Sequence, residues 1–336
     1  MKIRKIALKL SLAVLAALLL LTPIAISCSA TELYTKGEGE LKVVCTNFPT
    51  IDFASAAGGD LITLTALQTN GADLHSYTPT SKAIMALQAA DVLVCVGGSS
   101  DDIWLDDALL SANNPNLRVI KLTECVDRLI CTEDIHTTQP HEHEHDHEHE
   151  HEDGEHGHAH DEHVWTSLRN AQKIVTAISE AFAEIDTENA VNYRANAASY
   201  NQQLTALDAL YSAEIANAEH NTLLFADRFP FIYLVEDYGL EYYAAFSGCS
   251  TEVNASFETT STLISKVKEH NLSSIIIIDV SADNPPSIAQ TVASSTGAQI
   301  LSLNSCQAVN RKQLENGASY IDIMTENLNV LKEALN

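Results

Sequence analysis

The stretch TENAVNYRANAASYNQQLTALDALYSAEIANA, residues 187–218, decides the fold of this chain. It holds neither proline nor glycine and is rich in alanine, leucine, glutamine and glutamate, which are good helix formers. Its 32 residues therefore predict one continuous helix, about 48 Å long and able to join two domains rigidly. Apolar side chains recur three or four positions apart, as on one face of a helix, at Tyr193, Ala197, Tyr200, Leu204, Leu207 and Leu210.

Short apolar runs lie on both sides of this helix and alternate with longer helix-like segments. Such alternation predicts α/β units with parallel sheets, one set before the helix and one after it. Proteins built in this way bind ligands in the cleft, beside the carboxyl ends of the strands. We therefore predict two Rossmann-like α/β lobes joined by a long rigid central helix, with a site in the interlobe cleft. The expected strands are Leu41–Cys45, Leu61–Leu67, Val92–Val96, Arg118–Leu122, Thr222–Phe225, Leu240–Phe246, Ser274–Asp279 and Gln299–Leu303.

Length and charge bound the class of protein. The chain has 336 residues and 46% apolar content, which suits two domains with real cores. Its 45 acidic residues outnumber its 19 lysines and arginines and give a formal net charge of −26. Because that charge repels the phosphate backbone, the sequence excludes a nucleic-acid-binding protein.

The first 28 residues have the layout of an export signal. Four cations in the first nine residues precede a nearly uninterrupted apolar run, Leu10–Ile26. The run ends in Ala25-Ile26-Ser27-Cys28, which resembles a bacterial lipobox, so we expect lipid on Cys28. An ordinary cleaved signal and a retained anchor helix are the alternatives. We predict a signal peptide at residues 1–27, a tether at 28–40 and an extracytoplasmic protein that its lipid anchors to the cell membrane.

A histidine and acid tract follows the first set of strands. Ten of the 14 histidines fall within the 23 residues His141–His163, among ten Asp or Glu. No packed core can form from these residues, so segment 136–163 is expected to be a solvated loop. Imidazole with carboxylate suits Zn²⁺ and similar ions, although a plain charged loop or a pH switch is also possible. The predicted low-affinity ligands are His141, His143, His145, His147, His149, His151, His156, His158 and His160.

The same tract matches the HExxH pattern of metalloproteases, for example at His141–His145. That motif needs a stable helix that holds both histidines on one face, and a dipeptide repeat does not provide one. No Gly-x-Ser-x-Gly signature occurs either. We therefore do not expect an enzyme.

Three residues outside the repeats are candidates for a fixed site. His75 follows the Leu61–Leu67 strand, and Asp227 follows the Thr222–Phe225 strand. His163 lies where the tract ends and a helix-like segment begins. Each also has an ordinary structural explanation, such as a surface histidine, a residue beside a helix cap, or an Asp paired with Arg228.

The chain resembles a family at these positions. The runs Gly71–Tyr77 (GADLHSY) and Asp161–Trp165 (DEHVW), with the tract between them and the central helix, are similar to zinc and manganese solute-binding proteins of bacterial ABC importers. The resemblance covers Leu41–Asn336. It implies two α/β lobes bridged by a rigid helix, metal capture in the cleft and delivery to a membrane permease. It also implies that His75 and His163 are two of the metal ligands.

Two positions depart from the pattern of this family. Zinc-handling members place a third histidine where this chain has Ala226, so we expect the adjacent Asp227 to replace it as a ligand. A later segment that often carries an acidic ligand offers Asn304 and Gln307, and neutral amides are poor zinc ligands. We expect Zn²⁺, with Mn²⁺ as the alternative because oxygen ligands favour it.

The predicted organisation is an N-terminal lobe at 41–186, a linking helix at 187–218 and a C-terminal lobe at 219–336. The predicted function is a monomeric receptor that captures Zn²⁺, concentrates it with the loop and delivers it to an ABC permease. A surface adhesin or an extracellular metal buffer is the alternative. Among the cysteines, Cys45 and Cys95 are expected to be buried free thiols, and Cys125 with Cys131 is the favoured disulfide.

Overall fold

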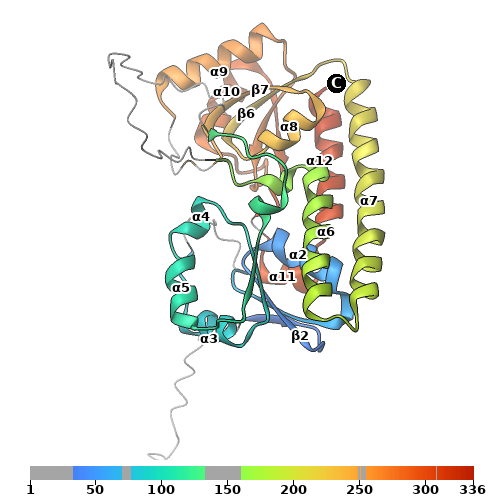
Figure 1. Cartoon of the computed structure of the whole chain (residues 1–336). Helices are drawn as coiled ribbons and strands as arrows, with labels where there is room; N and C mark the ends of the chain where they lie inside the picture. Colours follow the sequence, from blue (N-terminus) through green and yellow to red (C-terminus); the bar gives the residue numbers. More distant parts are fainter. Residues whose placement is uncertain (1–32, 70–76, 133–159, 249, 251–254, 308) are drawn as a thin grey trace, which may run out of the picture. The chain divides into compact units, whose positions relative to one another are not determined.

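The computed structural model describes residues 33–69, 77–132, 160–248, 250, 255–307 and 309–336 (Figure 1). Residues Leu33 to Asn336 form one compact unit. It contains a five-stranded and a four-stranded sheet, both mainly or wholly parallel, with helices packed on them. The predicted α/β class with two sets of parallel strands is confirmed.

The first sheet has the strand order β1-β3-β2-β4-β5. Strand β2 pairs in parallel with β3 and β4, and β4 pairs in parallel with β5. Every residue of β4 is buried, as expected for a strand covered on both faces. The bounds are β1 Tyr34–Lys36, β2 Leu41–Cys45, β3 Ile62–Ala66, β4 Val92–Cys95 and β5 Arg118–Lys121.

Strand β1 lies where the sequence predicts only a polar tether. Its residues pair antiparallel with β3, with Tyr34 opposite Ala66 and Lys36 opposite Leu64. The pairing occupies the edge of β3 that would otherwise expose unpaired backbone groups. A short strand held by backbone hydrogen bonds has no apolar pattern, and for this reason its composition did not reveal it.

The second sheet is parallel throughout, in the order β7-β6-β8-β9. Strand β6 continues four residues beyond the predicted end at Phe225, and its pairing with β7 shifts register between Phe225 and Arg228. Asp227 therefore lies at this irregularity, inside the range of the strand. The bounds are β6 Thr222–Phe229, β7 Glu241–Ser247, β8 Ser274–Ile278 and β9 Gln299–Leu303.

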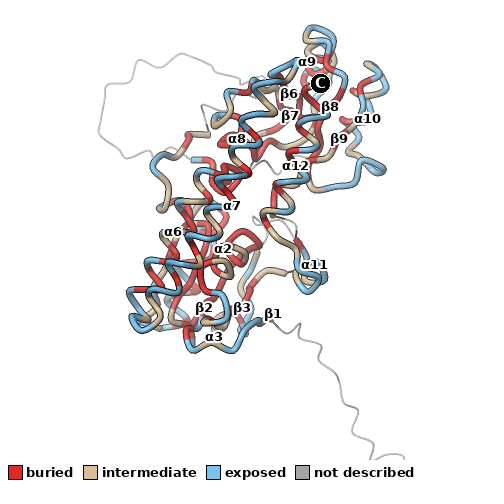
Figure 2. The backbone as a smooth tube through the Cα atoms, turned by 90° about the vertical axis from the view of Figure 1, so that its right-hand side faces the viewer, coloured by how far each residue is buried: buried red, intermediate tan, exposed pale blue. Residues whose placement is uncertain are grey.

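The predicted long helix is α7, Ala190–Ala216, which runs along one side of the described chain (Figure 1). Tyr193, Ala197, Leu204 and Leu207 are buried as expected, and Figure 2 shows the outer side of the helix exposed. Leu210, however, is 55% exposed, and Tyr211 is buried instead. With 3.6 residues per turn, spacings of four and three must alternate, so position 211 follows 204 and 207 on the buried face.

The other helices pack around the sheets and against α7. Helices α2 and α6 contact each other and α7, and α12 also contacts α7. Their bounds are α2 Phe48–Gly58, α3 Ser81–Ala89, α4 Ser99–Asp102, α5 Leu105–Ala112, α6 Leu168–Ile185, α8 Ile232–Tyr238, α9 Phe257–Glu269, α10 Ser287–Thr296, α11 Arg311–Glu315 and α12 Tyr320–Ala334.

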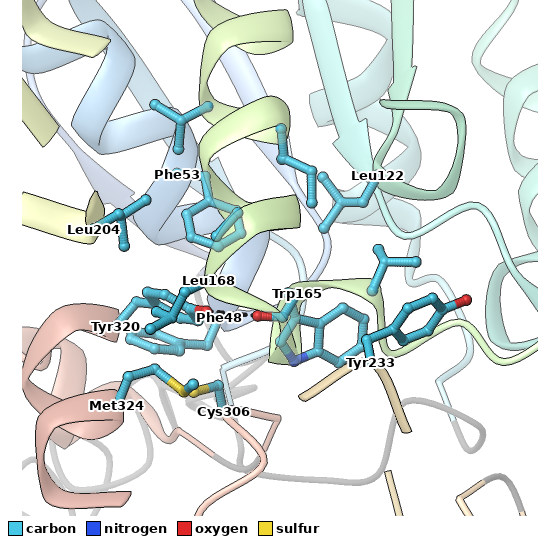
Figure 3. Close-up of a cluster of buried hydrophobic side chains, with 14 of the residues drawn as sticks. Phe48, Phe53, Leu122, Trp165, Leu168, Leu204, Tyr233, Cys306, Tyr320 and Met324 are labelled. Atoms are coloured by element: carbon cyan, nitrogen blue, oxygen red, sulfur yellow. Dashed lines mark hydrogen bonds between the residues drawn. The ribbon is translucent and has the colours of Figure 1, made fainter. Parts of the chain in front are cut away.

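One apolar core connects the two halves of the chain. Trp165 is fully buried, and its indole Nε1 donates to the backbone oxygen of Ser305 at 2.9 Å. The hydroxyl of Tyr320 donates to the backbone oxygen of Trp165 at 2.6 Å (Figure 3). Phe48 and Phe53 from the first half pack in the same cluster. The residue that follows His163 by two positions is therefore held by the second half of the chain.

The five cysteines that the structure describes are free thiols, and the predicted Cys125–Cys131 disulfide is wrong. Cys45 and Cys95 are buried free thiols, as predicted. The Cys125 thiol donates to the backbone oxygen of Lys121 at 3.2 Å, whereas the Cys131 sulfur lies 3.6 Å from Nδ1 of His160. Each sulfur thus has its own partner. Spacing in the sequence could not show that the 3₁₀ turn Leu122–Cys125 points the Cys125 thiol back at its own backbone.

A carboxylate lies at the meeting point of three helices. The hydroxyl of Tyr200 on α7 donates to Oδ2 of Asp52 on α2 at 2.5 Å, and the backbone N–H of Tyr320 on α12 donates to Oδ1 at 3.3 Å. Burial raises the pKa of Asp52 to about 6, although these two hydrogen bonds oppose the shift. The folded state therefore holds a proton on Asp52 more tightly than the unfolded state does.

This pKa shift predicts a measurable pH dependence of stability. Because the folded-state pKa is raised, the free energy of unfolding should increase as pH falls from 7 through 6 towards 4. Asp52→Asn should remove on the order of 1 to 3 kcal/mol of that increase. Urea unfolding at pH 7 and pH 5 measures it, with Asp60→Asn on the exposed surface as the matched control. Equal pH dependence in the wild type and in Asp52→Asn would contradict the assignment.

Candidate functional site

Three consecutive polar residues, Asp161, Glu162 and His163, are buried with a relative exposure of 0%. They lead into the 3₁₀ turn Val164–Thr166 and then into α6, whose N-terminus Ser167 caps by accepting from the N–H of Asn170. Charged residues are almost never fully buried unless they are paired or bind an ion. Their partners therefore indicate what this site does.

The His163 imidazole is held by the carboxylate two residues before it. Its Nδ1 lies 3.0 Å from Oδ1 of Asp161, and the same oxygen accepts the backbone N–H of His163 at 2.9 Å. A carboxylate partner places the proton on Nδ1 and leaves the lone pair on Nε2. Within the part of the chain that the structure describes, neither Nε2 of His163 nor Oδ2 of Asp161 has a hydrogen-bond partner, although both atoms are buried.

The electrostatics around His163 favour a positive charge on this ring. Burial lowers the pKa of His163, and Arg228 lowers it as well. Asp161 and Glu162 act in the opposite direction and outweigh both, so the pKa of His163 is raised above its usual value. The charges around His163 thus favour the protonated form of this ring.

Glu162 points to the first sheet. Its Oε2 accepts the backbone N–H of Ser100 at 3.0 Å and lies 3.5 Å from the hydroxyl oxygen of Ser99, at the start of α4 after strand β4. Gly98 lies directly against this carboxylate, where a Cβ atom would clash with Oε2. The close approach explains the glycine at this position. It also fixes Asp161–His163, the DEH segment, against the carboxyl end of β4.

The second half of the chain covers the same residues from the other side. The hydroxyl of Tyr233 on α8 donates to the backbone oxygen of Asp161 at 2.7 Å. Gly248, just after β7, lies so close that a Cβ atom there would be 3.1 Å from both Asp161 Oδ2 and Cε1 of His163. Residues that follow β4 and β7, one strand in each sheet, thus meet at Asp161, Glu162 and His163.

Asp227 is half-buried and serves the backbone of the second sheet. Its Oδ1 accepts the N–H of Arg228 at 2.8 Å, and its Oδ2 accepts the N–H of Ile278 at 3.2 Å. Burial raises its pKa, while these hydrogen bonds and Arg228 oppose the increase. Ala226 stands at the position where zinc-handling members of the family place a third histidine. It is fully buried in an apolar cluster with Ala245.

Sequence reasoning missed two carboxylates, Asp161 as the partner of His163 and Asp279 after β8. Asp279 accepts the N–H of Ser305 at 2.7 Å and the hydroxyl of Ser305 at 2.5 Å. Its backbone φ of 55° lies in the left-handed region, which Asp adopts more readily than most non-glycine residues. The available signal was an Asp directly after a buried strand, the signal that identified Asp227.

Several predicted site residues lie outside the described residues: Cys28, His75 and the loop histidines from His141 to His158. His160 is described and is exposed. Among the residues that the structure describes, no three His, Cys, Asp or Glu side chains gather closely enough to hold a metal ion. The side chains of Asn304 and Asn327 hold the backbone of the loop after β9 and its neighbours.

The part of the chain that the structure describes contains no helix with the length and apolar character needed to cross a bilayer.

Comparisons with known proteins point to one family. A family model described as zinc-uptake complex component A, periplasmic, matches residues 43–334. The high-affinity zinc uptake system protein ZnuA of Bacillus subtilis is 30% identical over 301 residues, which are 90% of this chain and 89% of that protein. The zinc-binding lipoprotein AdcA of Streptococcus pneumoniae is 27% identical over 308 residues, which are 92% of this chain but 58% of the relative.

Solved structures agree with this match. The metal-dependent lipoprotein YcdH from Bacillus subtilis has a TM-score of 0.70 at 28% identity and covers 88% of this chain and 99% of that one. Zn(II)-bound AdcA from Streptococcus pneumoniae has a TM-score of 0.66 at 25% identity and covers 88% of this chain and 58% of that one. With the family model covering nearly the whole described chain, this protein belongs to the family of zinc-uptake complex component A.

Proposed function

We propose that this protein is the extracytoplasmic zinc-binding component of an ABC importer, which captures Zn²⁺ and delivers it to a membrane permease. One observation carries the proposal: the buried Nε2 of His163 has no partner among the described residues, while Nδ1 is held by Asp161. The role is that of a binding component and not of an enzyme. Membership of a zinc-uptake family supports this function over an adhesin or a metal buffer.

The carboxylate and imidazole pair has the form of a metal ligand with its supporting residue. A histidine that binds a metal through one nitrogen commonly donates the N–H of the other to a carboxylate, which fixes the ring and makes it more basic. Asp161 does this for His163 at 3.0 Å. Such a ring presents a neutral nitrogen to the ion, and Zn²⁺ binds imidazole nitrogen well.

We propose His75 and Asp227 as the other protein ligands. His75 lies outside the described residues and stays a prediction from the sequence. Asp227 already accepts two backbone N–H groups, but a carboxylate has about four lone-pair sites and can still bind an ion. A site with two imidazoles and one carboxylate leaves a position for water, and it favours Zn²⁺ over Mn²⁺ because nitrogen ligands suit zinc.

The remaining parts of the proposal concern organisation. We propose an N-terminal lobe at 41–186, a linking helix at 187–218 and a C-terminal lobe at 219–336, with the cleft between the lobes as the site. We further propose a monomer that is anchored to the membrane by lipid on Cys28 after removal of residues 1–27. The loop histidines from His141 to His160 would collect Zn²⁺ weakly and raise its concentration near His163.

The first test is zinc titration of the body from Ser29 to Asn336. We expect one tight site plus several weak ones. The tight site should persist when residues 139–158 are deleted, a deletion that spares His160 and Asp161, and it should disappear in the His75→Ala, His163→Ala double variant. Asp227→Asn should weaken it as well. Loss of tight binding with the loop, rather than with the two histidines, would contradict a cleft receptor.

The second test concerns the partner of His163. Asp161→Asn should reduce zinc affinity by about 10- to 100-fold, the usual effect of removing such a carboxylate. A competition titration with a chelating dye measures the change. Asp106→Asn, an exposed acid on α5, is the control and should bind zinc as the wild type does. An unchanged affinity in Asp161→Asn would mean that the carboxylate does not support a ligand.

The third test is the pH dependence of binding. Protons compete with zinc for Nε2, and the pKa of His163 is raised by Asp161 and Glu162 against the effect of burial. Affinity should therefore begin to fall at a pH above the ordinary imidazole pKa of about 6.5 as the solution is acidified. Zinc affinities measured by competition from pH 8 to pH 5.5 locate the pH at which the affinity begins to fall. If that pH lies below 6, the role of His163 is contradicted.

A further inference from the structure

Cys131, which precedes the histidine and acid tract, lies beside His160 near the end of that tract. Cys131 and His160 form an isolated antiparallel β-bridge, and the N–H of Asp161 donates to the backbone oxygen of Ile130 at 2.9 Å. We call Cys131 and His160 the neck. The chain thus leaves towards the tract and returns from it at one place, directly before the buried DEH segment.

The neck is fixed by the second half of the chain. The Tyr233 hydroxyl accepts the N–H of Ile130 at 3.2 Å and donates to the backbone oxygen of Asp161 at 2.7 Å. One side chain on α8 therefore holds the backbone on both sides of the bridge. Ligands held in this way need little rearrangement to bind an ion.

The side chains at the neck are a thiol and an imidazole, which are the preferred ligands of zinc in proteins. The Cys131 sulfur lies 3.6 Å from Nδ1 of His160. In a tetrahedral site with ordinary Zn–S and Zn–N bonds, a sulfur and a nitrogen ligand lie about 3.6 Å apart. Cys131 is half-buried and His160 is exposed, so solvent ions can reach both.

We propose that Cys131 and His160 form a second metal site, which takes Zn²⁺ from the tract and passes it on to the site at His163. On binding, the thiol releases its proton to solvent and the ion takes the place of the thiol–imidazole contact. His160 precedes His163 by three residues, so the backbone between them spans at most about 11 Å. The transfer role rests on the proposed function, whereas the metal site itself rests on the geometry of the neck.

The site has two protein ligands, because no group of three such side chains occurs among the described residues. Water completes the shell, and an ion held by two side chains exchanges more readily than one in a full structural site. Exchange of this kind is what a transfer point requires. A tighter site at the neck would compete with the His163 site instead of supplying it.

Cys125 provides a matched control. It is also partly buried and lies six positions before Cys131, but its thiol donates to the backbone oxygen of Lys121 at 3.2 Å. Burial, with a smaller contribution from Glu124, raises the pKa of Cys125 to about 11, which disfavours the thiolate that a metal needs. Cys125 therefore carries the same thiol group as Cys131, but its sulfur faces a backbone oxygen and not an imidazole.

The test is Co²⁺ titration of the full chain in its reduced state, with absorbance followed in the near ultraviolet. Thiolate bound to Co²⁺ gives a charge-transfer band there, and imidazole and carboxylate ligands give none. We expect the band in the wild type and in Cys125→Ser, its loss in Cys131→Ser and a weaker band in His160→Gln. Absence of the band in the wild type, or its persistence in Cys131→Ser, would overturn the metal site.

A kinetic measurement tests the transfer role. The rate at which dilute zinc loads the tight site should fall in Cys131→Ser and should stay at the wild-type value in Cys125→Ser. An equal rate in Cys131→Ser would overturn the transfer role. The proposed function is tested separately, because His163→Ala should abolish tight zinc binding and leave the Co²⁺ band. A chain that shows the Co²⁺ band but has no tight zinc site would contradict the proposed receptor function, while the metal site at the neck would stand.

Discussion

The hydrogen bond between the Asp161 carboxylate and the His163 imidazole is the interaction on which the rest of this site depends. Both side chains are fully buried, and one carboxylate oxygen holds both the ring and the backbone N–H of His163. The bond sets which nitrogen carries the proton and therefore which one can accept a metal. Elements from both sheets approach these two residues: Glu162 is bound at the start of α4, and Gly248 lies against the ring.

This arrangement has an energetic cost. Two buried atoms, Nε2 of His163 and Oδ2 of Asp161, lack partners among the described residues. Each such atom costs about 1 to 3 kcal/mol. The surrounding core keeps the segment in place, since Trp165 is bonded both to Ser305 and to Tyr320. An ion that satisfies Nε2 offsets part of this cost and stabilises the folded state by mass action.

In the second half of the chain, an alanine and two carboxylates occupy positions near the strand ends where a third histidine ligand is absent, and each has a structural role. Ala226 completes an apolar cluster, and the neighbouring Asp227 ties β6 to β8 through the N–H of Ile278. Asp279 does the same for the loop after β9 by accepting two hydrogen bonds from Ser305. Carboxylates thus hold the strand ends of this sheet. Burial raises the pKa of both acids, and the charge of the nearby Arg228 opposes that increase.

The sequence by itself determined the α/β class, nearly every strand, a long helix at 187–218, which the structure has at Ala190–Ala216, and His163 as a candidate ligand. These features follow from local periodicity and from the Asp161–Trp165 motif, both of which involve residues close together in the sequence. Only the tertiary structure decided that Asp161 holds His163, that Asp227 and Asp279 bond to the backbone of adjacent segments, and that Cys131 faces His160 instead of Cys125. Most of these contacts join residues from separate elements, and hydrogen-bond direction leaves no periodic trace in the sequence.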